Sequence, residues 1–159
     1  MDFNYPYSGN LSLLDRPAVA FFASREVSQA QRRQALRWAE EIIPAGKAVI
    51  SGFQSPLEKE VFGRLLAARH PIIWALGRAL YKRYSPQVEG ALAEDRILVF
   101  SARSTARTGE WTALARNFLI TSVSDESFFV LNDAAGRRSS LEVLAQLEAG
   151  SAKQVRILR

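Results

Sequence analysis

The stretch Pro17–Ala23 (PAVAFFA) decides the fold class of the chain, because its nearly unbroken apolar run is typical of a strand covered on both faces. Ser28-Gln29-Ala30-Gln31 follows with the spacing of a capping box, in which a hydroxyl and an amide satisfy free N–H groups at a helix start. The helix that opens there carries an apolar stripe and is expected to end near Gly46. This part of the chain therefore predicts a buried strand followed by an amphipathic helix.

The same strand–helix pattern repeats along the chain. Further strands are expected at Ala48–Ser51, Ile72–Leu76, Ile97–Ser101, Phe128–Leu131 and Gln154–Leu158. Helices are expected between them, from Ser55, at Gln87–Ala93, from Trp111, and from Ser139 to near Gly150. Strands that alternate with helices through short loops predict an α/β fold, here a Rossmann-like three-layer sandwich with a mainly parallel sheet of about six strands. We expect one domain over residues 1–159, with an N-terminal lead-in segment at 1–16.

The composition, 48% hydrophobic and 23% charged, is typical of a globular domain. No apolar run is long enough to span a bilayer and the first residues lack the layout of a secretion signal, so we expect a cytoplasmic protein without a membrane partner. The chain has no cysteine and a single histidine, which excludes thiolate zinc sites and histidine metal clusters. We expect no metal, no cofactor and no catalytic residue. His70, at the head of an expected strand, is interpreted as a surface or packing residue.

The charge of the chain favours a phosphate-bearing partner. The net charge is +5, and 17 of the 21 basic residues are Arg, whose planar fork matches phosphate. A GC-rich genome, which raises Arg and Ala together, explains the Arg excess equally well. Residues 61–88 hold five basic residues and no Asp or Glu, so they form a candidate basic edge.

Ligands of open α/β sheets bind beyond the carboxyl ends of the strands, where the strand order reverses. The turns expected there carry small polar residues and arginines, which let an anion approach a helix start but also serve simply as caps and turns. The candidate phosphate-binding residues in these turns are Ser24, Arg25, Ser51, Gly52, Gln54, Ser55, Gly77 and Arg78, with Arg103-Ser104-Thr105 after the fourth expected strand. The glycine-rich fingerprints of dehydrogenases and P-loop ATPases are absent from the sequence. Glu58 is interpreted as part of a capping box rather than as an acid or base.

Four segments resemble, in order, the Rossmann-like domain of the DNA-processing protein A family (DprA, also called Smf). The first is Gly9–Pro17 with the following strand and Ala23-Ser24-Arg25, similar to the family's G-N-x-x-L-L start and G-S-R turn. The others are Ser51–Glu58, similar to S-G-x-A-x-G-I-D; Ala75-Leu76-Gly77 with Tyr84-Ser85-Pro86, similar to V-L-G and Y-P; and Arg116–Asp125, similar to R-N-R-I-I-x-x-L-S-D. The chain departs from these motifs at Ala23, Pro56, Glu58 and Phe118, and Gly136–Ser140 is only a loose match to the family's S-G-S/T segment.

The resemblance implies a non-catalytic module that holds single-stranded DNA in a basic crevice at the strand ends, in DNA processing, uptake or recombination. It adds Arg116 and Asn117 to the candidate phosphate-binding residues and implies that the chain can form a homodimer. The alternative is a protein of the same fold that binds a nucleotide or nucleotide-derived ligand and could hydrolyse its glycosidic bond, although the P-G-G-x-G-T-x-x-E segment of such hydrolases is absent. A purely structural or partner-binding role is a third interpretation.

Overall fold

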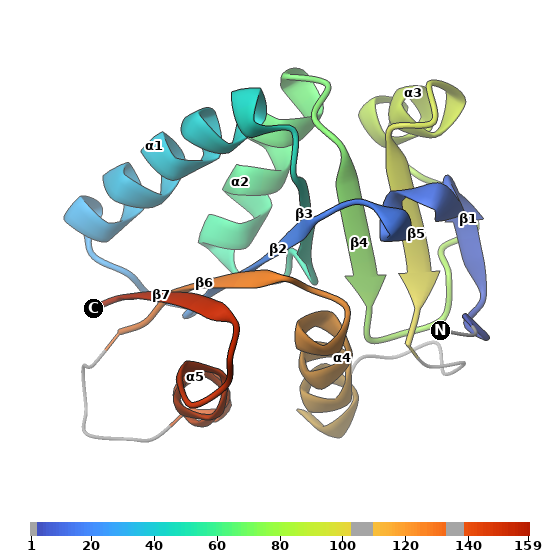
Figure 1. Ribbon diagram of the computed structural model, residues 1–159. Helices are drawn as coiled ribbons and strands as arrows, with labels where there is room; N and C mark the ends of the chain where they lie inside the picture. The colour runs from blue at the N-terminus through green and yellow to red at the C-terminus, as the bar shows by residue number, and fades with distance from the viewer. Residues whose placement is uncertain (1–2, 103–109, 133–138) are drawn as a thin grey trace.

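The computed structural model describes residues 3–102, 110–132 and 139–159. Within these ranges a seven-stranded sheet lies between two helical layers (Figure 1). The six strands that pair in parallel are β2 (Ala18–Ala23), β3 (Ala48–Ser51), β4 (Ile72–Leu76), β5 (Ile97–Ser101), β6 (Glu126–Val130) and β7 (Gln154–Leu158). The strand order is β1-β5-β4-β3-β2-β6-β7, so the α/β, mainly parallel prediction is confirmed.

The sheet has one strand more than the sequence predicted. This strand, β1 (Tyr7–Gly9), pairs antiparallel with β5 at the sheet edge and is followed by a 3₁₀ helix, η1 (Leu11–Asp15). Tyr7-Ser8-Gly9 is too short to show the apolar alternation that predicts a strand. The segment expected only to lead into the domain therefore forms part of the sheet.

Serine hydroxyls cap four of the helices. The helices α1 (Gln29–Ala45), α2 (Pro56–Ala67), α3 (Pro86–Ala93) and α5 (Ser140–Ala149) begin after Ser28, Ser55, Ser85 and Ser139, and each serine accepts an N–H three residues on. Complete capping boxes form at Ser28 and Ser55, as predicted. At Ser139 the box partner expected from the sequence, Glu142, forms an ion pair with Arg159 at 2.6 Å. The fifth helix is α4 (Glu110–Ser122).

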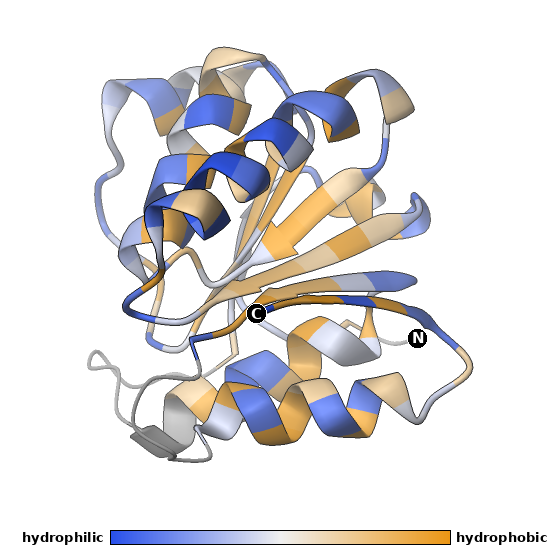
Figure 2. Ribbon diagram, turned by 90° about the vertical axis from the view of Figure 1, so that its left-hand side faces the viewer, coloured by the Kyte–Doolittle hydropathy of each residue, from blue (hydrophilic) through white to orange (hydrophobic). Residues whose placement is uncertain are grey.

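The two faces of the sheet bury separate apolar cores. Helices α1, α2 and α3 cover one face, and α4 and α5 cover the other (Figure 1). All six residues of β2 are buried because alternate side chains enter the two cores: Phe21 stacks on Trp38 of α1, and Phe22 stacks on Phe129 of β6. Figure 2 shows apolar strands between helices that carry both polar and apolar residues. This double burial explains the unbroken apolar run at Pro17–Ala23.

The strand order reverses between β2 and β6. From β2 the chain runs through β3 and β4 to β5 on one side, and then returns through α4 to β6 on the other side of β2. Helices therefore leave neighbouring strands toward opposite faces, α1 after β2 and α5 after β6 (Figure 1). A divergence of this kind opens a crevice at the carboxyl ends of the strands.

The opposite, amino end of the sheet is closed by paired polar groups. Lys47 Nζ forms an ion pair with Glu126 at 2.8 Å, and Asp125 accepts the backbone N–H of Ala18 at 2.9 Å. His70 is buried, and its Nε2 lies 2.5 Å from the carbonyl oxygen of Lys47. Burial lowers the pKa of His70 despite this contact. His70 therefore closes this end of the sheet as a packing residue, one of the two roles predicted.

No helix in the described part of the chain is both long enough and apolar enough to cross a membrane.

Candidate functional site

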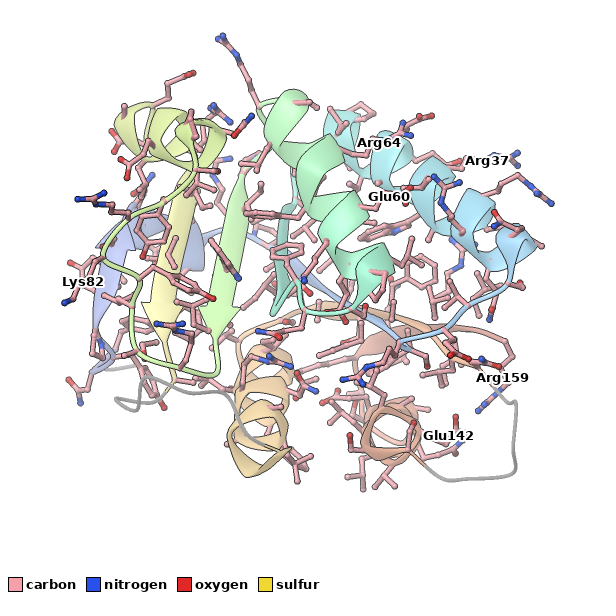
Figure 3. The ribbon with its side chains drawn as sticks, turned by 180° about the vertical axis from the view of Figure 1, so that it is seen from behind. Arg37, Glu60, Arg64, Lys82, Glu142 and Arg159 are labelled. Carbon is pink, nitrogen blue, oxygen red and sulfur yellow. The ribbon has the colours of Figure 1, made fainter. Side chains whose placement is uncertain are left out.

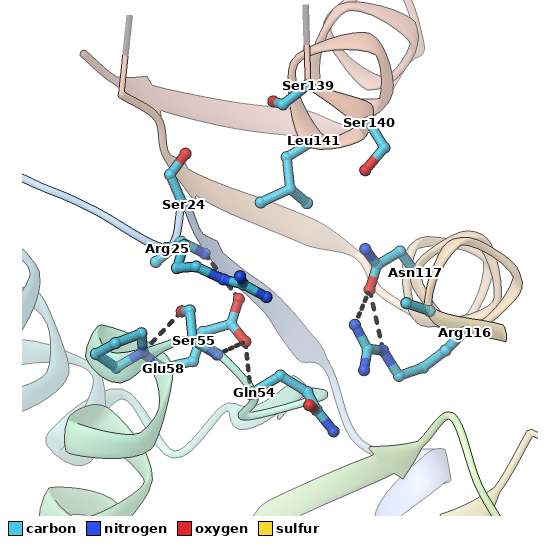
Figure 4. A pocket seen from close by; sticks show the side chains of 13 residues that line it. Ser24, Arg25, Gln54, Ser55, Glu58, Arg116, Asn117, Ser139, Ser140 and Leu141 are labelled. Atoms are coloured by element: carbon cyan, nitrogen blue, oxygen red, sulfur yellow. Dashed lines mark hydrogen bonds between the residues drawn. The ribbon is translucent and has the colours of Figure 1, made fainter. Parts of the chain in front are cut away.

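A crevice of about 660 Å³ lies at the point where the strand order reverses (Figure 4). It is bounded by the turns after β2 and β3 and by parts of α4 and α5. The lining residues are Ala23, Ser24, Arg25, Gln54, Ser55, Pro56, Glu58, Ala113, Arg116, Asn117, Ser139, Ser140 and Leu141. Six of the residues predicted for phosphate binding meet here: Ser24, Arg25, Gln54, Ser55, Arg116 and Asn117.

The guanidinium of Arg116 is a buried cation in this crevice. The residue is 6% exposed, and its Nε and Nη2 donate to Asn117 Oδ1 at 3.2 and 3.1 Å. Its Nη1 is buried and has no hydrogen-bond partner among the described residues. Burial lowers the pKa of Arg116, and Glu58 opposes that shift; an arginine nevertheless remains protonated in a protein. The crevice therefore contains a positive charge with one donor that no described residue accepts.

Gly52 makes room for this guanidinium. A Cβ at residue 52 would lie 2.7 Å from both Cζ and Nε of Arg116, closer than real Cβ contacts. Gly52 is buried beneath the crevice, so its predicted site role is steric: its missing side chain lets the cation lie against the backbone. The neighbouring Phe53 has a left-handed φ of +48°, which turns the chain from β3 toward α2.

Glu58 forms hydrogen bonds to both turns of the crevice, the one after β2 and the one after β3. Its Oε2 accepts the N–H of Ala23 at 2.9 Å, and its Oε1 accepts the N–H groups of Gln54 and Ser55 at 2.8 and 3.2 Å. Burial raises the pKa of Glu58, although these hydrogen bonds and the nearby Arg116 act in the opposite direction. The predicted capping role is confirmed. The N–H groups of Gln54 and Ser55, which the sequence suggested for an anion, are thus already occupied.

The serines of the first two turns also have internal partners. Ser24 donates its N–H to Val130 at 2.8 Å, and its hydroxyl accepts the N–H of Asn132 at 3.1 Å. Ser51 is fully buried and accepts the N–H of Phe53 at 3.1 Å, so it lies under the crevice rather than in its wall. Arg25, by contrast, is exposed and points into the crevice (Figure 4). Charged side chains, more than backbone N–H groups of these turns, face the cavity.

The structure does not bring Gly77 and Arg78 to the crevice. Gly77 is buried, and Arg78 donates to the carbonyl of Ala79 at 3.0 Å while its guanidinium lies 4.0 Å from the ring centre of Tyr81. Arg103-Ser104-Thr105 and Gly136-Arg137-Arg138 lie outside the described residues.

Sequence reasoning missed the first turn of α5. Ser139, Ser140 and Leu141 line the crevice opposite α2, so the positive end of the α5 dipole borders the cavity (Figure 4). The Ser-Ser-Leu-Glu pattern predicted this helix start, but the sequence does not show that β6, which precedes it, lies beside β2.

Basic and small polar groups are concentrated around the crevice. Arg25, Arg116 and the α5 start favour negative charge, and the hydroxyls of Ser55 and Ser140 add small polar surface. Among the described lining residues, the one carboxylate belongs to Glu58, which accepts hydrogen bonds from backbone N–H groups. Across residues 3–102, 110–132 and 139–159, no group of three or more His, Asp or Glu side chains could hold a metal ion.

Comparison with known proteins agrees with the fold. Residues 5–150 match the family described as DNA recombination-mediator protein A. The chain is similar to DNA processing protein A from Helicobacter pylori, a structure reported for its single-stranded DNA binding mode, with a TM-score of 0.73 and 21% identity over 96% of this chain and 70% of that one. It is also similar to DprA from Streptococcus pneumoniae, with a TM-score of 0.65 and 17% identity over 94% of this chain and 61% of that one.

A molybdenum cofactor binding protein from Rippkaea orientalis shares the fold at a TM-score of 0.50 and 14% identity, over 89% of this chain and 88% of that one. No curated protein matches the chain. At these identities the solved structures establish a common fold.

Proposed function

This chain belongs to the DNA recombination-mediator protein A family, and we propose that it is a non-catalytic module that holds single-stranded DNA in the crevice between the carboxyl ends of β2 and β6. The observation that carries the proposal is Arg116, a buried guanidinium whose Nη1 has no partner within the described part of the chain. A DNA phosphate supplies the missing acceptor and the missing negative charge. DNA processing, uptake or recombination is the corresponding cellular role, in the cytoplasm.

The energetics of Arg116 favour a ligand. A buried charge without a counter-ion is destabilising, and a charge-assisted hydrogen bond to phosphate contributes about 1.5–3 kcal/mol. Glu58 supplies only part of the compensation because its oxygens accept three backbone N–H groups. A phosphate between Arg116 and the first turn of α5 would face two sources of positive potential.

Arg25 extends the site toward solvent. It is exposed at the mouth of the crevice, where it can contact a second phosphate of an extended strand (Figure 4). Arg33, on the outer surface of α1, is equally exposed but lies outside the crevice lining. A comparison of Arg25 with Arg33 therefore distinguishes a local binding site from a diffuse positive surface.

Fluorescence anisotropy with a labelled oligonucleotide tests the proposal. Arg25→Ala and Arg116→Ala are each expected to weaken binding about 10- to 150-fold and to reduce the slope of log K against log salt by about one unit. Arg33→Ala is the matched control and should have only a small long-range effect. Equal small losses at all three positions would contradict a defined site. Failure of the unaltered protein to bind any oligonucleotide, with salt-insensitive binding of a mononucleotide, would favour the nucleotide-ligand alternative.

The homodimer expected from the family resemblance remains a prediction. Phe118 on α4 and Val143 and Leu147 on α5 are large apolar side chains with 46%, 44% and 58% exposure, all on one helical layer. Exposed apolar surface of this kind suits a second copy of the chain. Light scattering at tens of micromolar should give a dimer mass that Leu147→Lys lowers toward the monomer, and a monomeric mass for the unaltered protein would contradict the prediction.

A further inference from the structure

A cluster of five aromatic rings lies behind the turn that supports Arg116. Phe53 of the β3–α2 turn contacts Phe62 of α2 with ring centroids 4.5 Å apart, and Phe62 contacts Trp74 of β4 at 5.0 Å. Trp74 in turn contacts Tyr81 and Tyr84, from the loop before α3, at 5.9 and 6.2 Å. We call these five residues the aromatic cluster.

Four of the five rings of the aromatic cluster are partly open to solvent, and Phe53 is buried beneath them. A cavity of about 250 Å³ lies among Phe62, Trp74, Tyr81 and Tyr84, and each of these residues is half-buried. Trp74 is the one residue of β4 that is not fully buried. The volume of the cavity is below the ~300–1,000 Å³ of sites that enclose a whole small molecule. The cavity therefore suits a single planar ring system.

Positive charge surrounds this apolar cavity. Arg83 lines it, the Arg78 guanidinium lies over the Tyr81 ring, and Lys82 points outward from the same loop (Figure 3). The other cations of the basic stretch 61–88 lie elsewhere: Arg64 and Arg69 form ion pairs with Glu40 and Glu94. The predicted basic edge is thus concentrated beside half-buried aromatic rings, in the combination that single-stranded nucleic-acid sites use.

Gly52 connects the cavity to the crevice. Its carbonyl oxygen accepts the indole N–H of Trp74 at 3.2 Å, while its Cα lies against the guanidinium of Arg116. One residue therefore separates the ring of Trp74 from the buried cation. The hydrogen bond also fixes the orientation of the indole, which leaves a rigid ring surface beside the crevice.

We propose that the aromatic cluster binds a nucleobase of the same DNA strand whose phosphate lies at Arg116, with Arg83 and Lys82 facing the adjoining phosphates. This inference rests on the proposed function. The strand passes around the carboxyl edge of the sheet, from the crevice over the β3–α2 turn to the face covered by α2 and α3. Because every base has an apolar ring face, binding here is tolerant of sequence.

Two oligonucleotides of equal length, one of thymidines and one of abasic sites, test the inference by anisotropy. The unaltered protein should prefer the thymidine strand, and Tyr81→Ala should weaken binding of that strand by about 5- to 150-fold while leaving the abasic strand unchanged. Tyr7→Ala is the control, because Tyr7 is an exposed tyrosine that contacts Phe3 in the N-terminal segment. Arg116→Ala should weaken binding of both strands.

The outcomes separate the two proposals. Equal losses of both strands in Tyr81→Ala, or no loss, would overturn base binding and leave the phosphate site intact. Absence of binding by the unaltered protein would overturn both. An oligonucleotide that contains 5-iododeoxyuridine can be photo-cross-linked to the unaltered protein, which gives a readout that does not depend on whether a variant folds. Cross-links at Trp74, Tyr81 or Tyr84 are expected. Cross-links confined to other elements would contradict the inference.

Discussion

The two ends of the central sheet differ in how their charged groups are paired. At the amino end, charged side chains have partners: Lys47 pairs with Glu126, Asp125 accepts the Ala18 N–H, and His70 Nε2 lies against a carbonyl oxygen. Two buried atoms there, Ser127 Oγ and Arg96 Nη1, have no hydrogen-bond partner in the described ranges, although the Arg96 guanidinium also pairs with Glu94. At the carboxyl end, Arg116 is buried with a donor that has no partner in the described ranges. The same parallel strands thus end among paired charges on one side and beside an incompletely paired buried cation on the other. The difference indicates that the buried guanidinium lowers the stability of the carboxyl end.

The sharpest test of this contrast is Arg116→Met. Oligonucleotide affinity should fall about 10- to 150-fold, because the charge-assisted contact to phosphate is lost. The free energy of unfolding should stay within about 1 kcal/mol of the parent value, since removal of an unpaired buried charge offsets the lost contact with Asn117. Urea denaturation measures the second quantity. A variant that unfolds would show that Arg116 has a structural role instead.

Gly52→Ala tests whether the position of the Arg116 guanidinium matters, because it changes no charge. The new Cβ would lie 2.7 Å from Cζ of Arg116, so the guanidinium must move, and affinity should fall by roughly 10-fold with the loss of one aligned hydrogen bond. Gly63→Ala is the matched control, because residue 63 has open space around its Cβ position and lies within α2. That control should gain about 0.5–1 kcal/mol of stability and bind normally. Equal affinities for the two variants would contradict a fixed guanidinium.

The two ends should also respond oppositely to pH. Burial raises the pKa of Glu58 above its ordinary 4.5, so the folded state holds its proton more tightly and stability falls as the pH rises from 4.5 through the raised pKa. Burial lowers the pKa of His70 below its ordinary 6.5, so stability is present above pH 6.5 and is lost as the pH falls through the lowered pKa. Urea titrations from pH 4 to 8 should lose the first effect in Glu58→Gln and the second in His70→Gln. Identical pH profiles for parent and variants would refute both assignments.

The smallest expected effect is at the Lys47–Glu126 pair. Both side chains are about one-third exposed, at 37% and 28%, so screening limits the contribution of the ion pair to at most about 1 kcal/mol. Lys47→Met should therefore lower the free energy of unfolding slightly and leave oligonucleotide affinity unchanged, which thermal unfolding and anisotropy would show. A large loss of affinity would mean that the two ends are coupled.

Much of this architecture was readable from local sequence pattern. The apolar runs and serine caps predicted the six parallel strands and five helices, because strand burial and helix starts depend on residues close in sequence. The edge strand β1 was missed since Tyr7-Ser8-Gly9 gains its structure from pairing with β5, far along the chain. Local pattern contains no information on such a partner.

The candidate site was predicted only in part, because strand order depends on residues far apart in sequence. Ser24, Gln54 and Arg116 converge because the elements that carry them meet where the strand order reverses. Arg78 follows β4, which β3 separates from β2, so it lies beyond the crevice; strand order cannot be read from alternation alone. The capping pattern predicted that Glu58 accepts the Ser55 N–H, whereas its contacts to the N–H groups of Gln54 and Ala23 depend on how the side chain packs.

The central place of β2 has a consequence for how the protein is made. Its neighbour β3 is synthesised soon after it, but β6, which pairs with β2 from Val19 to Ala23, comes more than 100 residues later: the bond from Asn132 to Ser24 spans 108. At about 5–20 residues per second, roughly 5–20 seconds of translation separate the two walls of the crevice. Until then one edge of β2 is unpaired and apolar, so a stalled chain would expose an aggregation-prone strand and have no crevice. The crevice is therefore among the last features that the nascent chain acquires.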